Sequence, residues 1–224
     1  MTASKKNGDL YLIGFCVVSL FLMLGQIFLN SNISVVAESP VVTTESFDVS
    51  APPASVSRDE HAATNWDFGV KTEFKYSLNS QETLGGDYAV NIRIDSARIF
   101  LSLPVTVYLP ESPSPALAAH EQGHVTICKR VYQGAPRVAM MAARKVVGHS
   151  FSGSGSSEAA AYESALLQAE NTLIQYFKDH TADVAEGLSR LFDKLHPDGS
   201  ETTAASIEEV FRTFRETRRS VEIP

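Results

Sequence analysis

The chain has 224 residues, of which 44% are hydrophobic, and a formal net charge of -7. This length and composition predict a folded domain with its own hydrophobic core, and the lack of a Lys/Arg cluster excludes nucleic acid as an expected partner. The two cysteines predict no disulfide framework, because Cys16 lies in an apolar run and Cys128 in a predicted helix, where we interpret it as a small core residue.

Residues 10–29 form an uncharged, apolar run near the amino terminus. A helix of about twenty residues spans about 30 Å, which is the thickness of the hydrocarbon core of a bilayer. Two lysines precede the run and the next basic residue is Arg58, so the positive-inside rule puts residues 1–9 in the cytoplasm and the rest of the chain outside. We expect a retained single-pass transmembrane anchor, with cleavage of a signal peptide after Ala37 as the alternative.

Residues 30–63 are rich in Ser, Val, Thr and Pro and lack a helical period. Such a composition is typical of an extended, flexible linker. We therefore expect the folded domain to occupy residues 64–224 and to be tethered to the membrane by this linker.

The first part of that domain predicts a small antiparallel sheet. Apolar and polar residues alternate at 68–76 and again at 88–94, which indicates two strands, and Gly85-Gly86-Asp87 indicates the turn between them. Residues 97–109 are a third β-rich stretch, in which Pro104 suits a strand edge or a bulge better than the middle of a sheet.

His120-Glu121-Gln122-Gly123-His124 is an H-E-x-x-H motif, and it indicates a specific chemistry. Residues four apart lie on one face of a helix, so His120 and His124 can bind the same zinc ion. Glu121 then points toward a water on that ion and can take its proton as a general base. The motif therefore predicts a zinc-dependent hydrolytic site.

The helix that carries the motif is expected to have Ser114 as its N-cap and Pro115 as its first residue. It should end before Gly134-Ala135-Pro136 and be followed by a shorter helix over residues 137–147. Residues 148–157 are so rich in Gly and Ser that they predict a flexible loop, which can serve as a lid.

Three further helical segments are expected after this loop. The first has Ser157 as its N-cap and runs to about Phe177, and the others cover residues 184–195 and 207–219. Together with the strands, they predict one α+β domain whose carboxy-terminal half is mainly helical.

Two histidines do not complete a catalytic zinc site, which normally has three protein ligands. The longer metzincin pattern is absent, because Ile127 and Arg130 occupy the positions of its glycine and its third histidine. The third ligand must therefore come from the helical half of the chain. The candidate residues there are Glu158, Glu163, His149, His180, His196 and Asp198.

The chain combines an apolar amino-terminal segment, a pair of strands that begins at Trp66, the sequence Leu101-Ser102-Leu103-Pro104 and the H-E-x-x-H motif. Over roughly residues 66–199 this combination resembles a bacterial family of uncharacterised envelope proteins, described as predicted secreted zinc-dependent proteases with a zincin-like site. Members of that family carry a downstream Tyr-Asp-x-x-Thr-x-His-Gly element, and the nearest match here is Phe-Asp-Lys-Leu-His-Pro-Asp-Gly at residues 192–199. The resemblance implies His196 as the third zinc ligand, with Asp198 second.

These observations predict a zincin-like metallopeptidase that is anchored in the bacterial inner membrane and faces the periplasm. It would bind Zn²⁺ and hydrolyse a peptide or protein substrate of the cell envelope, with Glu121 as the catalytic residue. The 97–109 stretch is expected to offer a sheet edge to which an extended peptide adds as a strand. The alternative is a non-catalytic envelope module that binds a metal or a partner, but a purely structural zinc site needs no general base.

Overall fold

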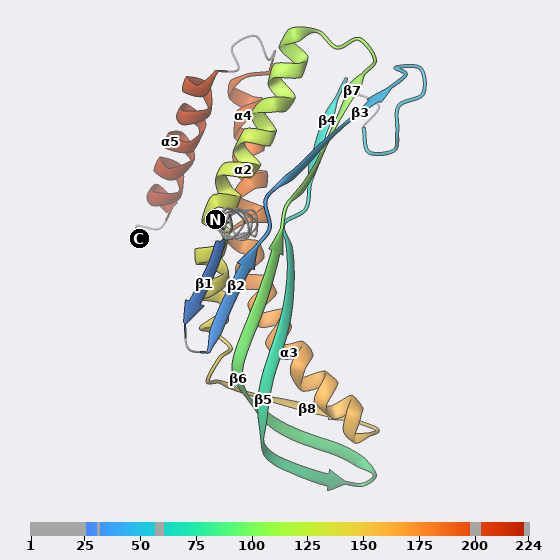
Figure 1. Cartoon of the computed structure of the whole chain (residues 1–224), viewed down its shortest axis with the longest axis vertical. Coiled ribbons are helices and arrows are strands. Elements are labelled where there is room, and N and C mark those ends of the chain that lie inside the picture. Colours follow the sequence, from blue (N-terminus) through green and yellow to red (C-terminus); the bar gives the residue numbers. More distant parts are fainter. Residues whose placement is uncertain (1–25, 31, 57–60, 198–202, 222–224) are drawn as a thin grey trace, which may run out of the picture.

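Two β-sheets and four helices make up the described part of the chain, which comprises residues 26–30, 32–56, 61–197 and 203–221 of a computed structural model (Figure 1). The strands are β1 (Gln26–Asn30), β2 (Ile33–Ala37), β3 (Val41–Phe47), β4 (Ala63–Trp66), β5 (Gly69–Leu84), β6 (Asp87–Ser102), β7 (Pro104–Pro110) and β8 (Ser150–Gly155). The helices are α2 (Pro115–Ala143), α3 (Glu158–Asp179), α4 (Ala182–Leu195) and α5 (Ala204–Val221). The predicted α+β class is confirmed.

The sheets are mixed rather than purely antiparallel. The larger one has the order β1-β2-β6-β5, with β8 also paired to β6, and the smaller one has the order β3-β7-β4. Strand β2 runs parallel to β6 and strand β3 runs parallel to β7, while the other pairs are antiparallel. The expected small antiparallel sheet is thus present only as part of a larger mixed arrangement.

The segment expected to be a flexible linker contains strands β2 and β3. The side chains of Ile33, Val35 and Ala37 alternate into the core, where they are buried, and their backbone pairs with β6 from Ala97 to Leu101. This alternation over a short run is what a half-buried strand requires, and the hydrogen-bonding partner lies some sixty residues later in the sequence. The folded domain therefore begins well before residue 64, and cleavage after Ala37 would remove β2 from the sheet.

The predicted transmembrane anchor lies for the most part outside the described residues, which begin at Gln26. Residues 26–29, which we expected to end the anchor, belong to strand β1 and pair with β2. Among the helices of the described residues, none is both long and apolar enough to cross a bilayer.

The turn predicted at Gly85-Gly86 joins the two longest strands, β5 and β6. Both glycines have positive φ angles, 61° and 98°, and Leu84 pairs with Asp87 across them. Two residues at positive φ are what a type I′ hairpin turn needs, and glycine adopts that conformation without a steric cost. Pro104 was expected on a strand edge or at a bulge, but β7 is the central strand of the smaller sheet; Pro104 is tolerated there because it is the first residue of the strand.

Helix α2 runs unbroken for 29 residues, where we expected two helices separated at Gly134-Ala135-Pro136. A proline inside a helix removes a hydrogen bond and costs about 3 kcal/mol. Here the same stretch carries Ala135, Ala139 and Ala142, all fully buried in the main core. Burial of this face of small residues stabilises a continuous helix despite Pro136. Local helix propensity alone does not predict this continuity.

Residues 148–157, expected to form a flexible loop, instead contain strand β8, which pairs with β6 and lies against α3. The glycines of this segment allow that close approach. A Cβ atom placed on Gly153 would lie 2.1 Å from the backbone oxygen of Ala161 and 2.4 Å from the backbone nitrogen of Ala165. The Gly/Ser-rich composition therefore reflects tight strand-to-helix packing, and a lid is not present in this position.

Gly153→Ala is expected to destabilise the protein by about 1 to 3 kcal/mol, because the added methyl group would overlap backbone atoms of α3 that cannot move without shifting the helix. Gly134→Ala is the matched control, since nothing lies within 4 Å of a Cβ there and alanine favours a helix by about 1 kcal/mol. Urea denaturation measures both changes. Equal midpoints for the two variants would contradict the packing proposed for β8.

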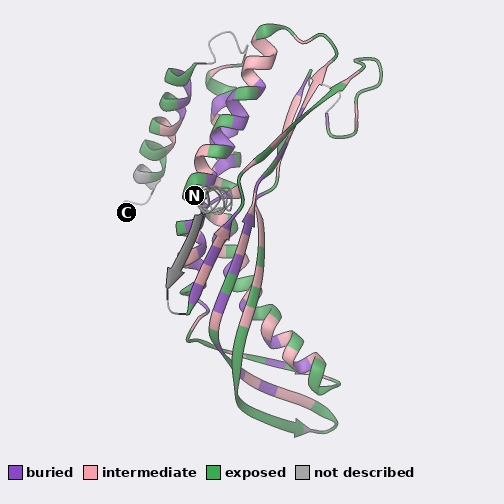
Figure 2. Ribbon diagram, viewed as in Figure 1, coloured by how far each residue is buried: buried purple, intermediate pink, exposed green. Residues whose placement is uncertain are grey.

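Three apolar clusters hold these elements together. The largest lies between the sheets and α2, and Leu173 and Phe177 of α3 also belong to it. A second joins the first half of β6, at Val90, Ile92 and Ile94, to α3. A third cluster joins α2, α4 and α5 through Ile127, Leu188, Phe192, Ile207 and Val210. Figure 2 shows buried positions alternating along β6 and concentrated where the helices meet the strands.

Cys128 is buried in the main cluster, and burial raises the pKa of its thiol to about 12, as suits a core residue.

Candidate metal centre and active site

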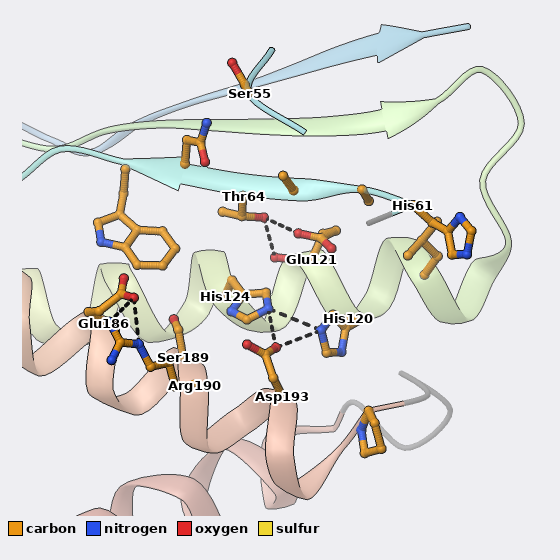
Figure 3. Close-up of a pocket in the computed structure, with 16 residues that line it drawn as sticks. Ser55, His61, Thr64, His120, Glu121, His124, Glu186, Ser189, Arg190 and Asp193 are labelled. Atoms are coloured by element: carbon orange, nitrogen blue, oxygen red, sulfur yellow. Dashed lines mark hydrogen bonds and ion pairs between the residues drawn. The ribbon is translucent and has the colours of Figure 1, made fainter. Parts of the chain in front are cut away.

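Helix α2 carries the motif residues on two of its faces. Ser114 caps it by accepting a hydrogen bond from the backbone N–H of Leu117 at 3.1 Å, and Pro115 is its first residue, as predicted. His120 and His124 are one turn apart, and their Nε2 atoms lie 3.2 Å from each other. Glu121 turns to the other side, toward strand β4 (Figure 3).

Asp193 lies on α4, and its side chain points at the two histidines of α2 (Figure 3). Its Oδ1 atom lies 3.1 Å from Nε2 of His120 and 3.0 Å from Nε2 of His124. Within the described residues, these three form the group whose ligand atoms all converge closely enough to hold one metal ion. The structure therefore contains a possible metal-binding site made by α2 and α4 together.

The spacing of these three atoms fits a zinc ion. Zinc binds imidazole nitrogen and carboxylate oxygen at about 2.0 to 2.2 Å in tetrahedral geometry, which places neighbouring ligand atoms about 3.3 Å apart. The observed separations of 3.0, 3.1 and 3.2 Å are close to that edge length. Two imidazole nitrogens and one carboxylate oxygen are thus spaced as the ligands of one metal ion would be.

The electrostatics of the cluster favour a cation. Burial alone opposes ionisation of Asp193, but hydrogen bonds from His120 and His124 outweigh it and hold the pKa of this carboxyl well below its usual range. The hydrogen bond to Asp193 in turn raises the pKa of His120, against the effect of burial. Without a metal, protons must lie between these atoms, and a divalent cation can replace them.

Phe192 fixes the orientation of both histidine rings. It is fully buried in the cluster that joins α2, α4 and α5. Its ring stacks on His120 with centroids 4.9 Å apart and meets His124 edge-on at 5.2 Å. A rigid apolar wall next to the ligands limits their rotation, so the Nε2 atoms stay directed at Asp193.

His196, predicted as the third ligand, is not part of the converging group. It is the C-cap residue of α4, its ring lies 5.5 Å from that of Phe192, and its buried Nε2 atom has no hydrogen-bond partner among the residues that the structure describes. Asp193 takes the position that we assigned to His196, because α4 directs the residue one turn earlier at α2.

The other candidate ligands that the structure describes also lie outside the converging group. Glu158 and Glu163 are on α3, and His149 lies between α2 and β8. His180 ends α3, where its ring stacks on Tyr176 and its Nδ1 atom lies 2.8 Å from the carbonyl oxygen of that residue. Asp198 lies outside the described residues.

Glu121 is buried, with an exposed fraction of 5%, and it faces β4. Its Oε2 atom accepts a hydrogen bond of 2.6 Å from the hydroxyl of Thr64. The carboxylate therefore belongs to a residue that lines the same cleft as His120, His124 and Asp193 but is not part of their converging group.

A cleft of about 860 Å³ opens over these residues. Helix α2 forms its floor, β4 forms one wall and α4 forms the other (Figure 3). The lining residues are Ser55, His61, Ala62, Ala63, Thr64, Asn65, Trp66, Leu117, His120, Glu121, His124, Glu186, Ser189, Arg190, Asp193 and Pro197. The metal ligands and Glu121 are thus accessible to a ligand of moderate size.

Asp193 and Thr64 are the two site residues that the sequence did not reveal. A signal existed for Asp193, because the Phe-Asp pair at 192–193 matches the Tyr-Asp pair of the downstream family element. Thr64 had none, since a single threonine in a segment taken for the end of a linker carries no pattern.

In comparisons with known proteins, no family model matched the chain. No curated protein was similar to it. No solved structure matched it either. The resemblance to envelope proteases therefore stays a prediction from the motif residues.

Proposed function

We propose that this protein is a zinc-dependent hydrolase that cleaves peptide bonds. The observation that carries the proposal is the convergence of Nε2 of His120, Nε2 of His124 and Oδ1 of Asp193 within 3.0 to 3.2 Å of one another, beside the buried carboxylate of Glu121. A structural metal site has no use for such a base, whereas a hydrolytic site requires one.

Zinc is the metal that this donor set favours. Two imidazoles with one carboxylate are borderline ligands, while calcium and magnesium prefer sites built from oxygen atoms alone. A zinc ion bound here supplies Lewis-acid activation of a carbonyl and of a water molecule. The chain's own residues then have separate tasks, in which the two histidines and Asp193 hold the ion and Glu121 handles protons.

Glu121 acts as the general base. It takes a proton from the attacking water and delivers it to the nitrogen of the leaving amine, so one carboxylate serves both halves of the reaction. Its burial under β4 keeps bulk water from competing for its oxygens. Phe192 holds the imidazoles in place while the charge on the substrate carbonyl develops.

An extended peptide would align along strand β4. The 97–109 stretch that we expected to offer an edge is flanked on both sides, since β6 lies between β2 and β5 there and β7 lies between β3 and β4. Within the described residues, β4 pairs with β7 alone and borders the cleft. Addition of a substrate strand to this free edge would place its backbone over the metal ligands.

The proposed location of the protein rests on the amino-terminal sequence and not on the fold. We propose that the apolar segment within residues 10–25 directs the chain to the bacterial inner membrane, with the site in the periplasm, because basic residues precede the segment and are sparse after it. Proteolysis of intact spheroplasts tests this orientation. Digestion of the carboxy-terminal part by external protease is expected, and full protection would contradict it.

Hydrolysis of an unstructured protein such as β-casein by the purified full chain tests the enzymatic proposal. We expect cleavage that stops when a chelator removes the metal and returns when zinc is added back, because the site needs the ion for Lewis-acid activation. Peptide products are followed by mass spectrometry. Stoichiometric zinc binding without any cleavage across a broad substrate panel would favour the non-catalytic binding module instead.

A further inference from the structure

Thr64 is the residue of β4 that touches the catalytic carboxylate. Its hydroxyl donates to Oε2 of Glu121 at 2.6 Å, while the backbone oxygen of Glu121 lies farther from it, at 3.4 Å. A hydroxyl has one proton to donate, so the shorter contact is the one that it satisfies. Among the hydrogen bonds of the described residues, none is made to the other carboxylate oxygen, Oε1, and Glu121 lines the cleft.

The backbone of Thr64 faces the free edge of β4. The N–H of Asp67 donates to the carbonyl of Pro104 in β7 at 3.1 Å, so these two residues occupy a hydrogen-bonded position of the ladder, with one bond instead of two because Pro104 has no N–H. Such pairs alternate along an antiparallel ladder, which directs the backbone of Asn65 toward β7 and that of Thr64 away from it. The N–H and C=O of Thr64 are therefore placed to pair with an added peptide strand.

We propose that Thr64 is a positioning residue that orients Glu121 and connects this orientation to the strand on which the substrate binds. The proposal rests on the hydrolase function proposed above. Its side chain holds Oε2 so that Oε1 points at the attacking water, and its backbone belongs to the strand that receives the peptide. A buried carboxylate without this donor would lose its partner and rotate away from the reactive geometry.

The test separates positioning from binding. Thr64→Val keeps the shape and the backbone but removes the hydroxyl, so kcat is expected to fall about 10- to 100-fold while KM and zinc stoichiometry stay unchanged. Thr64→Ser keeps the hydroxyl and should restore kcat to within about threefold of the unchanged protein. A threonine to valine change at Thr106 of β7, whose hydroxyl contacts Thr43 and not the site, is the matched control and should leave kcat unchanged.

A second readout does not depend on turnover. Trp66 is the one tryptophan of the chain and lines the cleft, so its fluorescence reports peptide binding to the metal-free full chain, in which no cleavage occurs. A short peptide that the unchanged protein cleaves should bind the Thr64→Val and unchanged proteins with equal affinity. An unchanged kcat in Thr64→Val, or failure of Thr64→Ser to restore it, would overturn the positioning role. Absence of any activity in the unchanged, zinc-loaded protein would instead remove the hydrolase function itself.

Discussion

Asp193→Asn is expected to abolish stoichiometric zinc binding, whereas His196→Ala is expected to bind zinc as tightly as the unchanged protein. Oδ1 of Asp193 lies 3.0 to 3.1 Å from both imidazole nitrogens and carries the negative charge of the cluster. Loss of a side chain that hydrogen-bonds a metal ligand costs about 10- to 100-fold in metal affinity, and loss of the ligand itself should cost more. Isothermal titration calorimetry of the metal-free full chain measures both affinities.

The pair is informative because both residues are at the end of α4, one turn apart, yet only Asp193 directs its side chain at the histidines. The backbone N–H of His196 donates to the carbonyl of Phe192 at 2.8 Å, and the change to alanine keeps this bond. Thermal melting of the metal-free variants shows whether either fails to fold. Weak zinc binding by His196→Ala together with normal binding by Asp193→Asn would restore His196 as the ligand and contradict the site described above.

Glu121→Gln is expected to lower kcat by about 10²- to 10⁴-fold, which is the usual contribution of a general base, while the zinc content stays at one ion per chain. The glutamine amide keeps the size of the side chain and can still accept the hydrogen bond from Thr64, but it cannot take a proton from water. Single-turnover cleavage of the peptide substrate, with zinc measured on the same sample, gives both quantities.

Glu186→Gln is a suitable comparison for this variant. Glu186 also lines the cleft, but it is half exposed and pairs with Arg190 rather than with the metal cluster. Its replacement is expected to change kcat by less than about threefold, because exposed ion pairs contribute little. If Glu121→Gln were no less active than Glu186→Gln, Glu121 would not be the base.

The sequence predicted the elements whose signals are local. The helix caps at Ser114 and Ser157 and the turn at Gly85-Gly86 are confirmed. They were predictable because each depends on residues only a few positions apart in the sequence. Of the three residues that converge, the sequence predicted the two that lie on one helix, His120 and His124, because they are four residues apart.

The failures share a physical cause, which is tertiary packing that overrides local composition. Strand β2 is held by pairing with residues 97–101, and α2 passes through Pro136 because its alanine face is buried. Gly153 looks like a loop residue in the sequence, yet in the structure it makes room for α3. Asp193 meets the histidines because α4 packs against α2, a contact between residues some seventy positions apart.

A crystal of the zinc-loaded protein, measured on both sides of the zinc absorption edge, tests the metal centre most directly. We predict one anomalous peak at about 2.0 to 2.2 Å from Nε2 of His120, Nε2 of His124 and Oδ1 of Asp193, with the carboxylate of Glu121 beside it but not bound. A peak elsewhere, or a peak here whose third protein ligand is not Asp193, would contradict the site.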